Sequence, residues 1–396
     1  MSKVIILLDP DAIFDERDAL LASLESAGFS VTELESLPDL LIVEGTSAED
    51  FPFKDAPGVI LVEDDAATAR PADTVTIEPR PVCGPWPKLR HISRANPWGR
   101  MTPDKLPWSG EFSCARNGEG VDFYIVDTGI VATHQEFNGR ATVLDGFTPL
   151  HTHGTTCASM GGGETIGIAP GVLIWSAAGL RNADNTGSTS AIITAINACL
   201  THYNGRADTD RPAVLSMSFS SSSETGSNPY SSAMSSCMNA GLVCVAAAAN
   251  DIKDLSTWNI WPAEQPGVIA VGGLNMDDGP YLLSGFGTNY GLRVDILAGS
   301  QDCRGADMSA DDAYRTGSGT SYGTPYVAGI IACILQSYRR LTSAAQVQQV
   351  GKYLYDTATF GAYKPDPRQE PMTPAIAYLD PGPGPWPPVP TLEPKV

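Results

Sequence analysis

Residues 121–130 read VDFYIVDTGI, an apolar run that stops at an aspartate followed by Thr128 and Gly129. The apolar residues 123–126 are typical of a buried strand, and the glycine marks a turn. A carboxylate directly after a buried strand lies at the carboxyl edge of a sheet, where α/β proteins keep their sites. The stretch therefore predicts an α/β domain with Asp127 at its functional edge. The alternative is that Asp127 only forms a turn before Gly129.

The surrounding sequence extends this prediction. From about residue 106 to 358, short apolar strands alternate with helical stretches and Gly-rich turns, which is the pattern of a doubly wound, mainly parallel α/β sheet. Residues 66–105 are rich in Pro, Arg and Trp and have no periodicity, so we expect a linker and processing segment there. Residues 359–396 include DPGPGPWPPVP and predict a proline-rich tail.

Residues 1–65 predict a small α+β domain of their own. The segments KVIILLD, SVTELES, DLLIVEG and GVILVED read as strands, and DERDALLASLESAG has the leucine spacing of a helix. Ser47 followed by Asp50 marks the start of a second, short helix. The resulting order β-α-β-β-α-β is that of a split, ferredoxin-like unit.

Composition excludes several classes of partner. The net charge is −20, from 45 acidic and 25 basic residues, so nucleic acid and anionic membrane surfaces would repel the protein. No segment approaches the roughly 18 apolar residues of a membrane span. The N-terminal stretch MSKVIILLDPDAIF is too short in its apolar part for a secretory signal. We expect a monomer that is intracellular, particle-associated, or secreted with its signal missing from this sequence.

The eight cysteines form no CxxC pair and no disulfide scaffold. Four lie among apolar residues and are expected in the core: Cys157, Cys199, Cys244 and Cys333. The other four lie in polar contexts, and the sequence leaves open one or two disulfides among them: Cys83, Cys114, Cys237 and Cys303.

Two further stretches carry residues with chemistry. Residues 150–162 read LHTHGTTCASMGG, in which His151 and His153 form either a His-x-His metal pair or a site with a single catalytic base. The residues after His153 are small, so a helix that begins there can pack closely. Residues 317–335 read GSGTSYGTPYVAGIIACIL and predict a helix with Ser321 at its positive end. Pro325 is then expected in the first turn, which tolerates proline.

Together these stretches resemble the subtilisin (subtilase) family of serine peptidases, close to its proteinase K branch. The resemblance runs from about residue 96 to 358. IVDTGI with THQEFNGRA looks like the aspartate block, HGTTCAS the histidine block and GTSYGTPYVAG the serine block. GIAPGVLIWSAAGL, VLSMSFS, VAAAAND, WPAEQPGVIAVGG and LSGFGTNYGLRVDILAGS follow in the family's order. The chain order Asp, His, Ser is the subtilisin order among triad folds.

The resemblance implies a catalytic role for four residues: Asp127, His153, Ser321 and the oxyanion-hole residue Asn250. His151 is then a neighbour at the rim. A metal site at the histidine pair would need further ligands, and the spacing of the remaining histidines offers none: His91, His134 and His202. No cofactor is expected for catalysis.

The resemblance also implies where protein or peptide substrates bind. Two edge segments and the residues before Asn250 match the family's substrate-binding positions: Asn185, Thr186, Gly187, Ser218, Phe219, Ser220, Ala248 and Ala249. The sequence departs from the family at Thr156, where a second histidine is usual, and at Ala249, where glycine is usual. Tyr322 and Gly323 follow Ser321. Ala249 and Gly323 are the departures that bear on the shape of the specificity pocket.

The loop GGGETIG is too short for the family's tight calcium loop. A structural calcium could instead be held by the carbonyls of Pro266 and Val268 with the carboxylate of Asp295, because calcium prefers oxygen ligands. Asp295 could equally serve in a turn or a salt bridge.

Residues 1–65, ending in PGVILVEDD, resemble the inhibitory propeptide that precedes many subtilases. The resemblance implies a self-inhibited and self-processing zymogen, in which this N-terminal prodomain is the inhibitor, with a cleavage point between Asp65 and the family-like start NPWGR at residues 96–100. Two function classes remain: an active serine endopeptidase, and a catalytically silent relative kept as a binding or structural component. The complete triad favours the endopeptidase.

Overall fold

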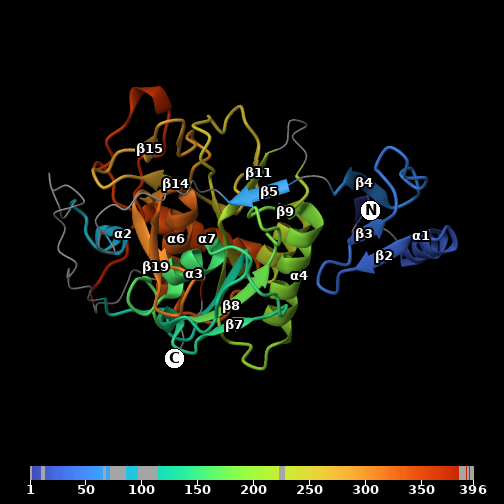
Figure 1. Cartoon of the computed structure of the whole chain (residues 1–396), viewed down its shortest axis with the longest axis horizontal. Coiled ribbons are helices and arrows are strands. Elements are labelled where there is room, and N and C mark those ends of the chain that lie inside the picture. The colour runs from blue at the N-terminus through green and yellow to red at the C-terminus, as the bar shows by residue number, and fades with distance from the viewer. Residues whose placement is uncertain are drawn as a thin grey trace.

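The computed structural model describes residues 2–9, 14–65, 68–71, 86–96, 114–222, 228–382, 389 and 392 (Figure 1). A small N-terminal unit lies beside a large α/β domain, on the side where the domain presents helix α4 (Figure 1). No helix in these ranges is long and apolar enough to span a bilayer.

The N-terminal unit is a four-stranded antiparallel sheet of order β2-β3-β1-β4 with one helix. Its elements are β1 (Lys3–Leu8), α1 (Phe14–Ser26), β2 (Ser30–Glu33), β3 (Leu40–Glu44) and β4 (Val59–Asp64). Alternation along β1 gives the sheet two apolar faces. Val4 and Ile6 pack with Leu20 and Leu24 of α1, whereas Ile5 belongs to the core of the large domain.

The predicted second helix of this unit is wrong. Residues 45–58, which begin with Gly45 and include Ser47 and Asp50, form turns between β3 and β4. Asp50 N donates to Ser47 Oγ at 3.2 Å, as in a helix cap, but no helix follows. Pro52 and Pro57 lie in this segment, and proline removes a helical hydrogen bond and clashes with the preceding turn.

The large domain is built on a seven-stranded sheet of order β17-β14-β12-β10-β6-β8-β7, in which every neighbouring pair is parallel. Its strands are β6 (Asp122–Asp127), β7 (Ala141–Val143), β8 (Leu173–Ala178), β10 (Ala213–Met217), β12 (Leu242–Ala247), β14 (Ile269–Leu274) and β17 (Ile296–Gly299). Except for β7, whose Thr142 is exposed, these strands are mostly buried and almost wholly apolar, as expected of a parallel sheet covered on both faces.

Two groups of helices cover the sheet (Figure 1). Helices α3 (His153–Gly162) and α6 (Thr320–Leu335) pack against each other, and α5 (Ser231–Asn239) packs against both α4 (Thr189–Gly205) and α7 (Ala344–Asp356). The predicted doubly wound α/β fold is confirmed. The short remaining elements are η2 (Gln135–Phe137), β15 (Leu282–Leu283), β16 (Phe286–Gly287), β18 (Cys303–Ala306), β19 (Tyr314–Gly317) and η3 (Pro367–Gln369).

A second, smaller sheet lies at the edge of the large domain, with the order β13-β11-β5-β9. Three of its strands come from the large domain: β9 (Gly187–Ser188), β11 (Phe219–Ser222) and β13 (Ile260–Trp261). The fourth, β5 (Thr68–Pro71), follows the N-terminal unit in the chain and is inserted between β9 and β11 (Figure 1). A part of the predicted linker is therefore a paired strand.

The predicted linker is also wrong for residues 86–96. Helix α2 (Trp86–His91) is packed into the large domain, with Arg90 and His91 fully buried. Arg90 Nε lies 2.6 Å from Asp278 Oδ1, and Trp86 Nε1 donates to Gln301 O at 2.9 Å. A charged residue is buried at low cost only when it is paired, and Arg90 is. Residues 86–96 therefore belong to the large domain.

The segment 372–381, predicted as part of a tail, is also built into the domain. Ile376 bridges to Leu297 at the edge strand β17, and the side chains of residues 375–377 are fully buried. Leu379 N donates to His91 O at 2.7 Å, and His91 Nδ1 donates to Ala377 O at 2.8 Å. We call residues 86–96 and 372–381 together the terminal clasp. The proline-rich residues 383–388 lie outside the described residues.

The described cysteines are all free thiols: Cys114, Cys157, Cys199, Cys237, Cys244, Cys303 and Cys333. The four expected in the core are buried there. Cys237 and Cys303, expected in polar surroundings, are buried too. The suggested disulfides are therefore not formed among Cys114, Cys237 and Cys303, and Cys83 lies outside the described residues.

Candidate active site

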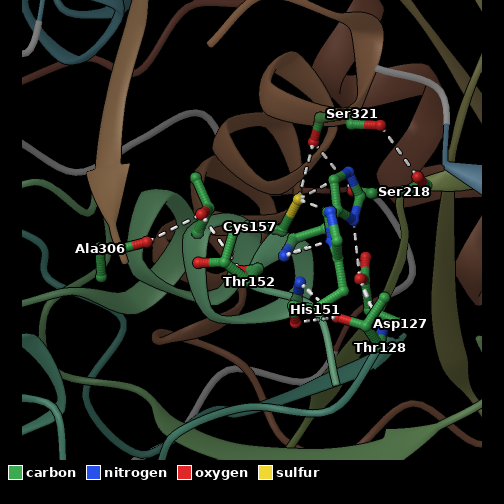
Figure 2. A network of polar contacts seen from close by, with 11 residues as sticks. Asp127, Thr128, His151, Thr152, Cys157, Ser218, Ala306 and Ser321 are labelled. Carbon is green, nitrogen blue, oxygen red and sulfur yellow. Dashed lines mark hydrogen bonds and ion pairs between the residues drawn. The ribbon is translucent and has the colours of Figure 1, made fainter. Parts of the chain in front are cut away.

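The site begins at the carboxyl edge of the large sheet, where β6 ends in Asp127. The Asp127 side chain is fully buried. Its Oδ1 accepts the backbone N–H of Thr128 and the Nδ1–H of His153, both at 2.7 Å (Figure 2). A carboxylate that accepts from imidazole Nδ1 fixes the tautomer of the ring and leaves Nε2 free to take a proton.

His153 is the first residue of α3, and its backbone is held by two neighbours. The next residue, Gly154, has no side chain, and a Cβ there would lie 2.3 Å from Gly129 O and 3.1 Å from Asp127 Oδ1. The glycine therefore allows the helix to approach the end of β6. Gly154 N donates to Thr128 Oγ1 at 2.9 Å, and that hydroxyl donates to His151 O at 2.9 Å.

His151 has a role that the sequence interpretation missed. Its Nδ1 accepts the backbone N–H of His153 at 3.2 Å (Figure 2). The first N–H groups of a helix have no partner within the helix, and the N-cap residue, Thr152, makes no side-chain bond to them. His151 thus caps α3 at the residue that faces Asp127. Histidine is not a usual capping residue, so no standard sequence signal points to this contact.

Ser321 is the second residue of α6, close to the positive end of that helix. Its Oγ donates to Ser218 O at 2.9 Å, and the Ser218 hydroxyl donates back to Ser321 O at 2.9 Å (Figure 2). Pro325 lies in the second turn of α6, not in the first as predicted. Having no N–H, Pro325 cannot donate to the carbonyl four residues before it, which is that of Ser321. The Ser218 hydroxyl satisfies this carbonyl instead.

Cys157, predicted only as a core residue, lies one helical turn after His153 and contacts both halves of the site. Its Sγ is 3.6 Å from His153 Nε2 and 3.5 Å from Ser321 O (Figure 2). Burial raises the pKa of the Cys157 thiol, so the group stays protonated and uncharged near neutral pH. The residue that replaces a histidine of the family, Thr156, donates to Ala306 O at 2.8 Å.

Asn250 follows β12 and points to the start of α6. Its Oδ1 accepts the backbone N–H of Thr320 at 3.0 Å, which fixes the orientation of the amide. Its Nδ2 is buried and has no hydrogen-bond partner among the described residues. A buried N–H without a partner is rare in folded proteins and often has a functional reason. Ala249, just before it, has a φ of 69°, a left-handed conformation that favours glycine.

Three of the residues implied to bind substrate pair with β5. Gly187 in β9 pairs with Ala69, and Phe219 in β11 pairs with Pro71, both in antiparallel register. Ser220 pairs with Arg70, and Ser218 precedes β11. The other implied residues lie close in the chain: Asn185, with a φ of 67°, Thr186, and the fully buried Ala248.

The residues named for calcium lie away from this site. Asp295 directly precedes β17 and so lies at the amino edge of the sheet, whereas Asp127 lies at the carboxyl edge. Asp295 and Val268 line one cavity of about 290 Å³, and Pro266 is not among its lining residues. Asp295 Oδ2 accepts the N–H of Ala270 at 2.8 Å, which leaves Oδ1 available to a cation.

The remaining histidines have structural partners. His91 binds within the terminal clasp, His134 Nε2 donates to Ala313 O at 2.8 Å, and His202 Nδ1 lies 2.8 Å from Tyr124 OH. None of the three lies next to Asp127 or Ser321 in these contacts. Among the predicted residues, the structure thus joins Asp127 with His153, and Asn250 with the helix that carries Ser321.

Comparison with known proteins finds a matching family and related sequences. The profile of the subtilase family matches residues 118–372. An extracellular serine proteinase of Thermus sp. (strain Rt41A) is 34% identical over 254 residues, which are 62% of this chain and 58% of that protein. A cuticle-degrading protease of Metarhizium anisopliae is 34% identical over 249 residues, 61% and 59% of the two chains. The chain thus spans less than two thirds of the length of these relatives.

The fold has a match among solved structures. The crystal structure of a cold adapted subtilisin-like serine proteinase superposes with a TM-score of 0.60 and 26% identity, covering 74% of this chain and 97% of the other.

Proposed function

The chain belongs to the subtilase family, and on that premise we propose that it is a serine endopeptidase with Ser321 as nucleophile, His153 as base and Asp127 as orienting carboxylate. The observation that carries the proposal is the 2.7 Å contact between Asp127 Oδ1 and His153 Nδ1. It leaves His153 Nε2 as the ring nitrogen for proton transfer, and that atom lies 3.6 Å from Cys157 Sγ, which in turn contacts Ser321 O at 3.5 Å. Relatives named as serine proteinases support the same reaction class.

Acylation follows from the roles of these side chains. His153 Nε2 takes the proton of the Ser321 hydroxyl while Oγ attacks the scissile carbonyl carbon, and it then gives that proton to the leaving amine. Asp127 stabilises the imidazolium that forms between the two steps. Water then hydrolyses the acyl-enzyme through the same base, which regenerates Ser321.

The unpartnered Asn250 amide supports a role as oxyanion donor. Its Nδ2 is buried and its orientation is set by the bond to Thr320 N. Together with the backbone N–H of Ser321 it would bind the oxygen that becomes negative in the tetrahedral intermediate. A preorganised donor needs no reorientation during the reaction, which is why such groups stabilise a transition state more than a bound substrate.

We propose that substrates bind as an extra strand. The position of β5 between β9 and β11 supports this, because an extended peptide there pairs on both edges through its backbone. Backbone pairing is independent of side chains, so specificity must come from pockets. Ala249, where the family usually has glycine, adds a methyl group close to Asn250.

We also propose that the chain is made as a self-inhibited zymogen, with the N-terminal unit as inhibitor. Three contacts with the large domain support it. Asp65 Oδ1 accepts the N–H of Ser190 at the start of α4 at 2.6 Å, Ser36 N donates to Asn197 Oδ1 at 2.9 Å, and Ser232 Oγ donates to Asp39. The chain then continues into β5, which fills the place proposed for substrate.

For calcium we propose a structural ion held by Asp295 with the carbonyls of Val268 and Pro266. Oxygen donors suit this ion, and the carboxylate has one oxygen uncommitted to Ala270. The ion would stabilise the amino edge of the sheet and would take no part in the reaction.

A fluorophosphonate probe tests the function. We expect the matured protein to be labelled at Ser321, and Ser321→Ala and His153→Ala proteins to remain unlabelled and inactive on peptides. Ser159→Ala is a matched control, since Ser159 is buried in α3 and donates to Thr156 O. A folded, unlabelled wild type with its prodomain removed would favour the silent binding alternative.

A further inference from the structure

We propose that Asn289 is a positioning residue for Asn250: it fixes the backbone on both sides of Asn250 and so aims the side-chain amide that would bind the oxyanion. The inference rests on the proposed endopeptidase function and deepens it by adding a residue that acts through the oxyanion donor. Asn289 follows β16, is fully buried and is remote from Asn250 in the chain.

The segment that follows Asn250 runs beside the segment that contains Asn289. Isolated parallel bridges join residue 251 with residue 287 and residue 254 with residue 290. The hydrogen bonds of Asn289 cross from the second segment to the first, through both its backbone and its side chain. Two stretches that are far apart in the sequence are thus held in one register at the oxyanion donor.

Asn289 holds the peptide group on each side of Asn250. Its backbone N–H donates to Ala249 O at 3.0 Å, and this oxygen belongs to the peptide group before Asn250. Its Oδ1 accepts the N–H of Asp251 at 2.9 Å, and this nitrogen belongs to the peptide group after Asn250. Gly287 N also donates to Asn250 O at 3.1 Å. Because both peptide planes are fixed, the direction in which the Asn250 side chain leaves the backbone is fixed as well.

The backbone around Asn250 is strained, and Asn289 bridges the strained part. Ala249 has a φ of 69° and Ile252 a φ of 54°, and both values are left-handed. This conformation is uncommon for alanine and a genuine outlier for a β-branched residue such as isoleucine. Asn289 Oδ1 accepts a second N–H, that of Lys253 at 2.9 Å, and so spans Ile252. Strained residues persist where the surrounding contacts hold them, and they cluster at functional sites.

The carboxamide of Asn289 is used there as an acceptor only. Its Oδ1 accepts two backbone N–H groups, whereas its Nδ2 is buried and has no hydrogen-bond partner among the described residues. A buried N–H without a partner lowers stability. Fold stability alone therefore does not account for an asparagine at this position, and a role in the site does.

The contacts of Asn289 complete the control of the oxyanion donor. Thr320 N donates to Asn250 Oδ1 and sets the rotation of the amide, while Asn289 sets the place from which the side chain starts. An oxyanion donor acts within about 2.7–3.1 Å of the developing charge, and a displacement of about 1 Å can cost about 10²-fold in rate. Since the oxyanion exists only in the transition state, the loss should appear in kcat and not in KM.

The test compares the steady-state kinetics of variants prepared from the full chain. Immobilised trypsin removes the N-terminal unit, so that slow variants are matured like the wild type. We expect Asn289→Ala to lower kcat about tenfold and to leave KM within about twofold. In an Asn250→Ala background, Asn289→Ala should change kcat by less than about twofold, because the group that it positions is gone.

Asn275→Ala is the matched control. Asn275 Oδ1 also accepts two backbone N–H groups, those of Asp277 and Gly279 at 2.9 and 3.0 Å, and none of its described hydrogen bonds reaches residues 249–253. We expect its kcat to equal that of the wild type. The kcat of each protein is given per site labelled to completion by a fluorophosphonate, so misfolded chains do not enter the comparison.

A second variant covers the case in which Asn289→Ala yields no labelled sites. The hydroxyl of Asn289→Ser is too short to accept both N–H groups, and the same pattern of kcat and KM is expected with a smaller loss. A labelled enzyme whose kcat is unchanged by these substitutions, or whose loss appears in KM or is equally large without the Asn250 amide, overturns the inference and leaves the proposed function standing. A wild-type chain that neither labels nor cleaves any peptide overturns both.

Discussion

Acid should weaken the protein through one buried side chain of the terminal clasp, His91. Burial lowers the pKa of His91 from 6.5 to about 4. In the folded chain its Nδ1 donates to Ala377 O, and its Nε2 accepts the N–H of Gly299 at 3.3 Å, which requires the neutral ring. Below pH 6.5 the unfolded chain binds a proton at this residue and the folded chain does not, so stability falls as the pH falls.

The size of the effect follows from the two pKa values. A pKa shift of one unit corresponds to about 1.4 kcal/mol of unfolding free energy. The unfolding free energy lost through His91 therefore levels off near pH 4 at about 3 kcal/mol. Between pH 7 and pH 5 the contribution of His91 is about 2 kcal/mol of unfolding free energy. At pH 7 and above the contribution is flat, because the ring is neutral in both states.

Urea unfolding of the inactive Ser321→Ala protein, followed by fluorescence at several pH values, measures this effect without self-digestion. Other groups titrate over the same range, so the comparison is with His91→Gln in the same background. Glutamine can donate to Ala377 O and does not titrate. We expect the His91→Gln protein to lose about 2 kcal/mol less between pH 7 and pH 5. Equal losses in the two proteins would refute the reasoning.

Four further predictions concern the site and the proposed ion. Asn250→Ala should lower kcat by about 10²–10³ with little change in KM, a magnitude taken from subtilisin itself and so borrowed through the family. A decrease of kcat by less than a few-fold in steady-state kinetics would contradict the proposed role of the Asn250 amide. Ala249→Gly should shift preference toward Phe and Tyr before the scissile bond by roughly 1–3 kcal/mol, read from a peptide library; an unchanged profile would speak against a tight pocket. His151→Ala should cost about 1 kcal/mol of unfolding free energy, as the loss of a helix cap does. It should slow self-processing a few-fold, whereas His153→Ala should stop it. An equal loss of the self-processing rate in both variants would mean that His151 moves protons. In calorimetry, calcium should raise the Tm of the wild-type protein and leave the Tm of the Asp295→Asn protein unchanged. A Tm that rises equally in both proteins would exclude Asp295 as a ligand.

The α/β fold and the position of Asp127 could be predicted because their causes are local. An apolar run such as residues 123–126 is buried wherever it occurs in a parallel sheet, and the chain direction puts the next residue at the carboxyl edge. Small residues after His153 predict close packing for a similar reason. A Cβ at Gly154 would collide with the backbone of Gly129.

The features that sequence reasoning missed depend on partners far away in the chain. Nothing in the segment around Arg90 indicates that Asp278, 188 residues later, neutralises it, so the segment looks like a linker. The residues of β5 have no strand pattern of their own, since their partners in β9 and β11 provide the pairing. The false second helix of the N-terminal unit had a local cause, because the capping signal at Ser47 was given more weight than two prolines.

The terminal clasp determines how the large domain resists force. Both of its segments meet at the last strand of the sheet: Leu297 in β17 exchanges backbone hydrogen bonds with residues 375 and 377, and His91 binds residues 377 and 379. A pull on either end of the domain is therefore carried by the same sheet edge, where several bonds must break together. Force applied through either segment would thus load β17 before the strands that end near Asp127 and Asn250.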